Sequence, residues 1–311
     1  MLDAASARSE LTIEPVVPVG RRQAIATSLG GTVGILRRDR FALVGVVIYI
    51  LFIFMAIFGP ALAPHDPQMV MEDDGIWLTN QPPSAQFPLG TTNVGRDILS
   101  QLIHGARPAL MVGLSAAFMV AVVGTVVGLI SGYFGGRTDA ILMRLTDIGF
   151  GIPFLPFVIV LVAFLGPSIW NIVLAMGILL WCDTARIIRK QINTKRQRAF
   201  VQAAKISGAS DWRTIFLYIA PNILSLSFLY GTLAIGWAIL TEASVSFLGF
   251  GDPAVVSWGF MLQDAYVSQA LARGAYYWFV PPGICIMLAV MAGFFIGRGY
   301  EELLFPRLRE R

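Results

Sequence analysis

The residue types that most often carry chemistry are rare and scattered in this sequence. The two cysteines, Cys182 and Cys285, lie in apolar stretches without the CxxC spacing of zinc or redox sites. The two histidines, His65 and His104, are far apart in sequence, and a metal site would need more ligands. The sequence therefore predicts no metal site, and it contains no ligand cluster that would favour nickel.

The lysines argue against one further kind of site. A phosphate-binding loop needs GxxxxGK followed by Ser or Thr. The sequence has three lysines, Lys190, Lys195 and Lys205, and none of them follows a glycine. We therefore expect no bound cofactor and no ATP hydrolysis on this chain. If ATP is used, another protein must bind it.

Glu242 is a carboxylate within an apolar stretch, LTEASVSFLGFG, and charge inside a membrane is costly and often functional. It could line a translocation cavity or a gate. Alternatively, it could be a carboxylate near the membrane interface that is satisfied by Thr241, Ser244 or a neighbouring helix. The sequence leaves both interpretations open.

Two other pairs of charged residues have the spacing of contacts on one helix face. Arg144 and Asp147 stand at positions i and i+3, which favours a structural ion pair. Asp183 and Arg186 have the same spacing and allow the same interpretation. Neither pair suggests a proton relay.

Helices within a membrane must position these residues. Of the 311 residues, 56% are hydrophobic and 14% are charged, whereas soluble domains carry about 25% charged residues. A bilayer core about 30 Å thick needs roughly 20 apolar residues in a helix. Six stretches are predicted to span it: 41–63, 108–136, 141–165, 169–182, 221–240 and 278–297. The predicted fold class is an all-α membrane protein with six transmembrane helices.

Basic residues indicate the orientation, because Lys and Arg near the spans are retained on the cytoplasmic side. With a cytoplasmic N-terminus, all but three of the 23 basic residues lie in or beside cytoplasmic segments, the exceptions being Arg96, Arg107 and Arg273. Six spans then place both termini in the cytoplasm. The predicted organisation is a flexible cytoplasmic tail (1–36), a first span with an outer segment (37–107), a transmembrane core (108–297) with a cytoplasmic loop (183–220), and a cytoplasmic C-terminal tail (298–311).

Two long outer segments are expected to meet the membrane surface. In the segment 64–107, the apolar residues Ile98, Leu99, Leu102 and Ile103 share one helical face, which predicts an interfacial helix. Around the segment 251–277, several aromatic residues suit the outer membrane interface: Trp258, Tyr266, Tyr276, Tyr277 and Trp278.

The most informative segment is 200–222, which reads FVQAAKISGASDWRTIFLYIAPN and predicts two short helices with a sharp bend. Ala203 and Ala204 are small enough for close helix contact, and Gly208 permits a turn. Ser210 or Asp211 can cap the next helix, and Pro221 ends it. The segment contains no nucleophile, metal ligand or phosphate cradle. Its expected work is mechanical contact.

Taken alone, the segment 200–222 would also suit a DNA-binding helix-turn-helix. Its position between two membrane spans argues against that, because a recognition helix could hardly enter a major groove, and we expect no nucleic acid partner. An amphipathic loop that packs on its own bundle is a stronger alternative. The sequence does not exclude it.

The segment resembles the EAA loop of binding-protein-dependent ABC importer permeases, in which Glu-Ala-Ala is followed by Gly four residues after the second Ala and then by Pro. Gln202, Ala203, Ala204, Gly208 and Pro221 stand at these places, and Gln202 replaces the usual Glu. In that family the loop sits in a groove of an ATPase subunit. The resemblance implies an ATPase-coupling role for nine residues: Gln202, Ala203, Ala204, Lys205, Gly208, Ala209, Ser210, Asp211 and Pro221.

Four further segments are similar to the C-type subunit of dipeptide, oligopeptide and nickel permeases: FPLGTTNVGRDILSQLIHGAR, GYFGGRTDAILMRLTDIGFGIP, LTEASVSFLGFGDP and SWGFMLQDA. With the EAA-like loop they cover most of 87–222 and continue to Asp264. The sequence departs from that family at Thr92, where Asp is usual, and at Tyr218, where His is common. The resemblance implies a type I ABC importer fold.

The resemblance also implies an assembly in a bacterial or archaeal inner membrane that imports peptides or similar polar solutes. The implied partners are a second homologous permease subunit, two cytoplasmic ATPases that hold ATP and Mg²⁺, an extracytoplasmic solute-binding protein and membrane lipid. Oligosaccharides, opines or nickel are alternative cargoes.

Two alternatives come from other functional classes. An ion-gradient-driven secondary transporter or channel would need broken helices in two matching halves, and the sequence shows no such internal repeat. The second alternative is a membrane scaffold or sensor, whose inner loop merely binds a partner.

Overall fold

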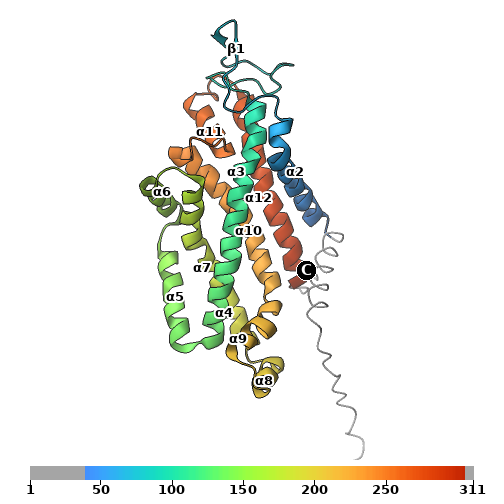
Figure 1. Cartoon of the computed structure of the whole chain (residues 1–311), viewed down its shortest axis with the longest axis vertical. Helices are drawn as coiled ribbons and strands as arrows, with labels where there is room; N and C mark the ends of the chain where they lie inside the picture. The colour runs from blue at the N-terminus through green and yellow to red at the C-terminus, as the bar shows by residue number, and fades with distance from the viewer. Residues whose placement is uncertain (1–38, 305–311) are drawn as a thin grey trace, which may run out of the picture.

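The computed structural model describes residues 39–304, which form an elongated bundle of helices (Figure 1). Five helices are long and apolar enough to cross a membrane, and a bent pair of helices provides a sixth crossing if it counts as one span. This agrees with the predicted all-α membrane protein. The predicted tail 1–36 and residues 305–311 lie outside the described residues.

The first span, α2 (Arg40–Leu62), begins after Asp39, whose carboxylate accepts a hydrogen bond from the Phe41 N–H at 2.8 Å. It packs against α3 (Ile98–Met119) and α12 (Tyr276–Leu304). Only 17% of its most apolar window is buried. Most of the α2 surface is therefore available to lipid.

The two ends of the molecule differ in structure. Between α2 and α3 the chain forms an antiparallel hairpin of β1 (Glu72–Asp73) and β2 (Ile76–Trp77). Asp74 and Gly75 at its turn have φ values of 49° and 77°, as a tight two-residue turn requires. The short helix α8 (Ala199–Ile206) lies at the opposite end (Figure 1). We refer to these as the hairpin end and the loop end.

The second span is a continuous helix, Ile98–Phe134, that passes from α3 through the π-helical turn η1 (Val120–Gly124) into α4 (Thr125–Phe134). The residues predicted to form an interfacial helix are thus continuous with this span and form its first turns. Charge interrupts the apolar run at Arg107, but this side chain is exposed and the backbone continues as a helix.

The next span is bent. The helices α5 (Gly136–Gly151) and α6 (Phe154–Leu165) meet at 87°, whereas the sequence predicts one span over 141–165. A residue before proline is restricted to extended conformations, and Ile152, before Pro153, has φ −92° and ψ 124°. The pair lies along the margin of the bundle (Figure 1).

The helix of the fourth predicted span, α7 (Ile169–Lys195), continues well beyond the predicted end at Cys182. The first part of the predicted loop 183–220 is therefore helical. Polar residues end an apolar run, but they do not end a helix whose backbone hydrogen bonds are satisfied internally. In the structure the loop therefore begins only after Lys195.

Three glycines one turn apart, Gly124, Gly128 and Gly132, bring α4 against α7. A Cβ atom on Gly128 would lie 2.7 Å from the carbonyl oxygen of Ala185 and 2.8 Å from the Cβ atom of Ile188. Small residues at this spacing allow membrane helices to approach closely. This contact is not among the predictions from the sequence.

The chain completes the bundle with α10 (Leu224–Val245), the π-helical turn η4 (Ser246–Phe250), α11 (Trp258–Val267) and α12. The fifth predicted span, 221–240, is therefore displaced toward the hairpin end. Buried apolar residues form separate clusters at the hairpin end, in the middle and at the loop end.

The aromatic residues predicted for the outer interface divide into two groups. Trp258 and Trp278 are each 1% exposed and belong to the core, where the Trp258 ring centroid lies 5.1 Å from that of Phe52. Tyr266 and Tyr276 are 73% and 59% exposed. The exposed tyrosines are thus compatible with the predicted place at the outer membrane interface. The two tryptophans are core residues, so the prediction is wrong for them.

Candidate functional site: the loop between α7 and α10

Between α7 and α10 the chain leaves the bundle as the short helices α8 and α9 (Asp211–Arg213), followed by η2 (Thr214–Ile219) and η3 (Ala220–Asn222). We refer to residues 196–223 as the α8–α9 loop. Gly208 has φ 79°, a left-handed conformation that favours glycine, and makes the bend. Two short helices with a bend at Gly208 agree with the prediction from the sequence.

Most of the residues predicted to couple to an ATPase are accessible. Seven of them are exposed: Gln202, Ala203, Lys205, Gly208, Ser210, Asp211 and Pro221. Ala209 is half-buried. Ala204 is only 6% exposed and packs inward beside the fully buried Val201. In this conformation Ala204 is therefore not part of the accessible surface of the loop.

Exposed apolar side chains, which are not among the residues predicted from the sequence, also lie on the surface of the α8–α9 loop. Ile206 is 87% exposed and Trp212 is 54% exposed. The Trp212 ring stacks on Phe216, with ring centroids 5.9 Å apart, and meets the edge of Phe134 at 6.0 Å. Helical periodicity could have found Ile206, because it lies on the face of α8 opposite Val201.

The α8–α9 loop is fixed to the end of α4 by polar contacts. The Tyr133 hydroxyl donates a hydrogen bond to Asp211 Oδ1 at 2.6 Å. The Lys205 ammonium lies 4.9 Å from the centre of the Tyr133 ring. Arg196 Nη1 donates to the carbonyl oxygens of Gly132 and Tyr133 at 3.4 and 3.5 Å. Asp211, predicted as a coupling residue, thus also holds the loop to the bundle.

Ion pairs connect α5 to α7 near the loop end. The Arg189 guanidinium binds the Asp139 carboxylate, with Nη2 2.5 Å from Oδ2. Arg186 Nη2 lies 2.6 Å from Asp147 Oδ1. The sequence predicted that Asp147 pairs with Arg144 of its own helix. Among the described residues it pairs instead with Arg186 of another helix. Spacing along one helix permits a contact, but packing between helices selects the partner.

Glu242 is 2% exposed and lies inside the bundle near the hairpin end. Its Oε1 atom accepts a hydrogen bond from the Ser246 hydroxyl at 2.6 Å. Thr241 and Ser244, the donors considered from the sequence, instead donate to backbone carbonyls of their own helix. Gly259 of α11 packs against Ala243 so closely that a Cβ atom would lie 2.5 Å from the Ala243 carbonyl oxygen. In this conformation Glu242 faces protein.

The surroundings of Glu242 predict a structural role. Replacement of Glu242 by Gln should leave uptake unchanged, because the amide oxygen can still accept the hydrogen bond from Ser246. Replacement by Ala should lower stability by about 1–3 kcal/mol, because the buried hydroxyl loses its acceptor. Thermal unfolding in detergent and uptake in vesicles measure the two effects. Loss of uptake in a Gln variant of normal stability would instead assign Glu242 to the pathway or gate.

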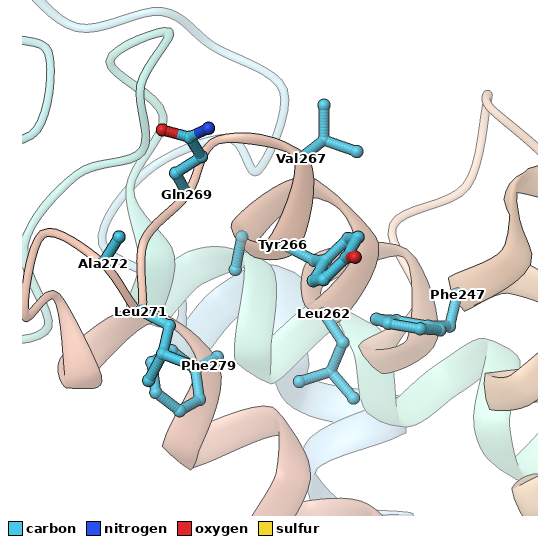
Figure 2. Close-up of a pocket in the computed structure, with 9 residues that line it drawn as sticks. Phe247, Leu262, Tyr266, Val267, Gln269, Leu271, Ala272 and Phe279 are labelled. Atoms are coloured by element: carbon cyan, nitrogen blue, oxygen red, sulfur yellow. The ribbon is translucent and has the colours of Figure 1, made fainter.

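An apolar recess of about 710 Å³ opens at the hairpin end beside α11 (Figure 2). Phe247 and Tyr266 face one another across part of it, with ring centroids 5.6 Å apart. Leu271 and Phe279 lie at another side, and Gln269 contributes an amide. The recess can hold apolar groups, and its lining contains no carboxylate or basic side chain.

Titratable residues do not gather elsewhere into a metal site. Within residues 39–304, no group of three or more His, Cys, Asp or Glu side chains is placed to hold a metal ion. His65 Nδ1 lies 3.4 Å from Asp97 Oδ2, and the same oxygen accepts a hydrogen bond from the Ser100 hydroxyl at 2.5 Å. This partly buried cluster links the outer segment to the start of α3.

Comparisons with known proteins match nearly the whole chain. Residues 124–310 match the family described as "Binding-protein-dependent transport system inner membrane component". Residues 32–83 match the "N-terminal TM domain of oligopeptide transport permease C". The first of these regions contains the α8–α9 loop.

Three transport permease proteins are similar to this chain over most of its length. The di/tripeptide transport system permease protein DppC of Pseudomonas aeruginosa is 37% identical over 281 residues, covering 87% of this chain and 89% of that protein. The oligopeptide transport system permease protein OppC of Bacillus subtilis is 37% identical, covering 88% of both chains. The glutathione transport system permease protein GsiD of Pectobacterium atrosepticum is 32% identical, covering 88% and 89%.

Proposed function

The chain belongs to the family of binding-protein-dependent inner membrane transport components, the permeases of ABC importers, and on that premise we propose that it forms half of an import pathway for peptides or similar polar solutes. The names of its relatives include di/tripeptides, oligopeptides and glutathione. These solutes share peptide bonds and charged ends. Peptides are therefore the cargo class best supported for this multi-pass inner membrane permease.

The observation that carries the proposal is the exposed apolar surface of the α8–α9 loop at the end of a bundle of membrane helices. Ile206 and Trp212 have little to gain from water, whereas a groove of a partner protein would bury them. The adjoining Lys205 and Asp211 are held by Tyr133, so the loop offers a fixed shape. We infer that an ATPase subunit receives this surface and that ATP and Mg²⁺ bind there rather than on this chain.

Charge supports the proposed orientation. Basic residues crowd the loop end on α7 and just beyond it: Arg186, Arg189, Lys190, Lys195, Arg196 and Arg198. Acidic residues stand at the hairpin end: Glu72, Asp73 and Asp74. A cytoplasmic loop end follows from retention of basic residues on that side, and both termini are then cytoplasmic. The hairpin end would meet a solute-binding protein, and a second permease subunit would complete the pathway.

Deletion of residues 208–211 should abolish copurification of the ATPase and leave membrane insertion intact. The deletion removes the exposed bend and the Asp211 contact with Tyr133, but none of the residues buried in the membrane bundle. Pull-down of the chain from solubilised membranes, with quantification of bound ATPase, measures the effect. Deletion of residues 73–76 removes the same number of residues from the hairpin at the opposite end and should leave the ATPase bound.

Full retention of the ATPase after the 208–211 deletion would refute docking through this loop. Uptake in reconstituted vesicles separates the functional classes: an importer of this family requires ATP, whereas a secondary transporter responds to an ion gradient. Uptake that persists without ATP and follows the gradient would support the second class.

A further inference from the structure

The apolar recess beside α11 lies where two membrane spans end. Phe247 belongs to η4, at the end of the span that begins with α10, and Phe279 lies in the first turns of α12. Tyr266, which lines the recess, and the nearby Tyr276 are both exposed. Tyrosines are enriched where a membrane meets water. The recess therefore lies at the level of the membrane surface at the hairpin end.

A stripe of exposed side chains leads along α12 to the recess. Its members recur every three or four residues and so share one helix face: Tyr276, Val280, Ile284, Met287, Met291 and Phe294. Among the five long helices described, α12 has the smallest buried share after its neighbour α2, 28% of its most apolar window. The Tyr276 ring centroid lies 5.8 Å from that of Phe279, which lines the recess. The recess thus adjoins a surface that lipid tails can cover.

The turn that borders the recess is fixed by the backbone. The Ala270 N–H donates a hydrogen bond to the Ala265 carbonyl oxygen at 2.9 Å, and Ala270 is fully buried. Within this turn Gln269 has φ 55°, a left-handed conformation that reverses the chain after α11. Leu271 and Ala272 are thereby held on one side of the recess (Figure 2). The recess is therefore formed before any ligand arrives.

Arg273 stands at the rim of the recess, directly after Ala272. Its guanidinium donates a hydrogen bond to the Ser268 carbonyl oxygen on the other side of the turn. The Arg273 side chain is exposed, and within residues 39–304 it pairs with no carboxylate. A guanidinium has five N–H donors in a geometry that matches phosphate oxygens. A positive charge that can bind phosphate thus borders an apolar interior.

A phospholipid combines the same two properties, because it carries a phosphate at the membrane surface and apolar chains below it. We propose that the recess binds one phospholipid of the leaflet at the hairpin end, with an acyl chain in the apolar interior and the phosphate on Arg273. The volume of about 710 Å³ suits a bound small molecule, for which about 300–1,000 Å³ is usual. The lining contains no charged side chain that would disfavour an acyl chain.

The position of the recess favours a lipid over a peptide. A peptide with an apolar side chain and a carboxylate offers similar chemistry, but it arrives from water. A lipid reaches the recess along the exposed stripe of α12. The bound lipid would hold α11 against the ends of α10 and α12, and this role does not depend on which solute is imported.

The first test measures phospholipid that stays bound. The chain is purified in detergent with the subunits that accompany it from native membranes and is examined by native mass spectrometry. The native assembly should retain a phospholipid that Arg273→Glu loses several-fold, because the new carboxylate repels the phosphate. Arg273→Lys should retain most of it. Arg107→Glu makes the same change at another exposed arginine of the hairpin end and should retain the native amount. Equal retention in the two Glu variants would overturn the proposal.

The second test locates the acyl chain. The same assembly is placed in nanodiscs that contain a phosphatidylglycerol with a photoactivatable diazirine in its acyl chain. Irradiation should label residues 262–279 as well as α2. Ala272→Trp fills the recess from an exposed position and should lower the labelling of 262–279 several-fold, with α2 as the internal reference. Ala61→Trp changes an exposed alanine of α2 and should leave the labelling of 262–279 unchanged.

Two other outcomes would identify a different occupant and overturn the proposal. Lipid labelling of 262–279 in the isolated chain but not in the assembly would show that another subunit covers the recess. Labelling of 262–279 by a peptide that carries photo-leucine, without labelling by the lipid, would assign the recess to cargo. Circular dichroism of Ala272→Trp and Arg273→Glu checks that the helices are intact, as expected because both native side chains are exposed.

Discussion

Replacement of Ile206 by Asp is expected to abolish ATP-driven uptake and leave the helix bundle folded. The Ile206 side chain is 87% exposed, so the substitution removes no internal packing. If the side chain fills a pocket of the ATPase, loss of this contact and burial of a new charge should weaken binding by about 2 kcal/mol or more, or about 30-fold. Titration of the purified ATPase against the variant in lipid nanodiscs measures the affinity.

A matched control for Ile206 exists at the opposite end of the molecule. Ile76 in the hairpin is 71% exposed, and its replacement by Asp makes the same chemical change away from the α8–α9 loop. This control should bind the ATPase with native affinity. Native affinity in Ile206→Asp itself would show that the ATPase does not cover this part of α8.

Replacement of Gly128 by Leu is expected to prevent stable packing of α4 on α7. Even the Cβ atom would lie 2.7 Å from the backbone oxygen of Ala185, and backbone cannot move aside as a flexible side chain can. Overpacking of this kind should cost about 3 kcal/mol or more. Thermal unfolding and size-exclusion profiles in detergent should show a large loss of the folded form.

Gly283 in α12 provides the control, because a Cβ atom there would meet nothing within 4 Å. Leu at this position should be tolerated and should even favour the helix slightly, because Leu has a higher helix propensity than Gly. If Gly128→Leu unfolds at the same temperature as Gly283→Leu, the close approach of α4 and α7 is not needed for stability.

The features that the sequence predicts best are those imposed by the bilayer. A backbone in lipid must satisfy its own hydrogen bonds, so a long apolar run becomes a helix almost regardless of detail. The predicted span 41–63 accordingly matches α2, and the bend at Gly208 follows from the ability of glycine to adopt positive φ.

Helix ends and side-chain partners were harder to predict. Charge marks where an apolar run stops, but α3 and α7 continue as helices past their charged residues, because hydrogen bonding along the helix does not depend on lipid. The break before Pro153 has a signal in the sequence, because the residue before a proline is restricted to extended conformations. The inward position of Ala204 and the pairing of Asp147 with Arg186 depend on neighbouring helices that are remote in sequence, so local spacing could not reveal them.

The Tyr133–Asp211 hydrogen bond makes the end of α4 and the α8–α9 loop one mechanical unit. In the proposed importer, this contact would help to transmit coupling between the two ends, and coupling between binding free energies is reciprocal. If ATP binding to the partner raises the affinity of the hairpin end for the loaded solute-binding protein by some factor, docking of that protein must raise the affinity for ATP by the same factor. Arrival of cargo on one side of the membrane would thereby be sensed as a change in nucleotide affinity on the other.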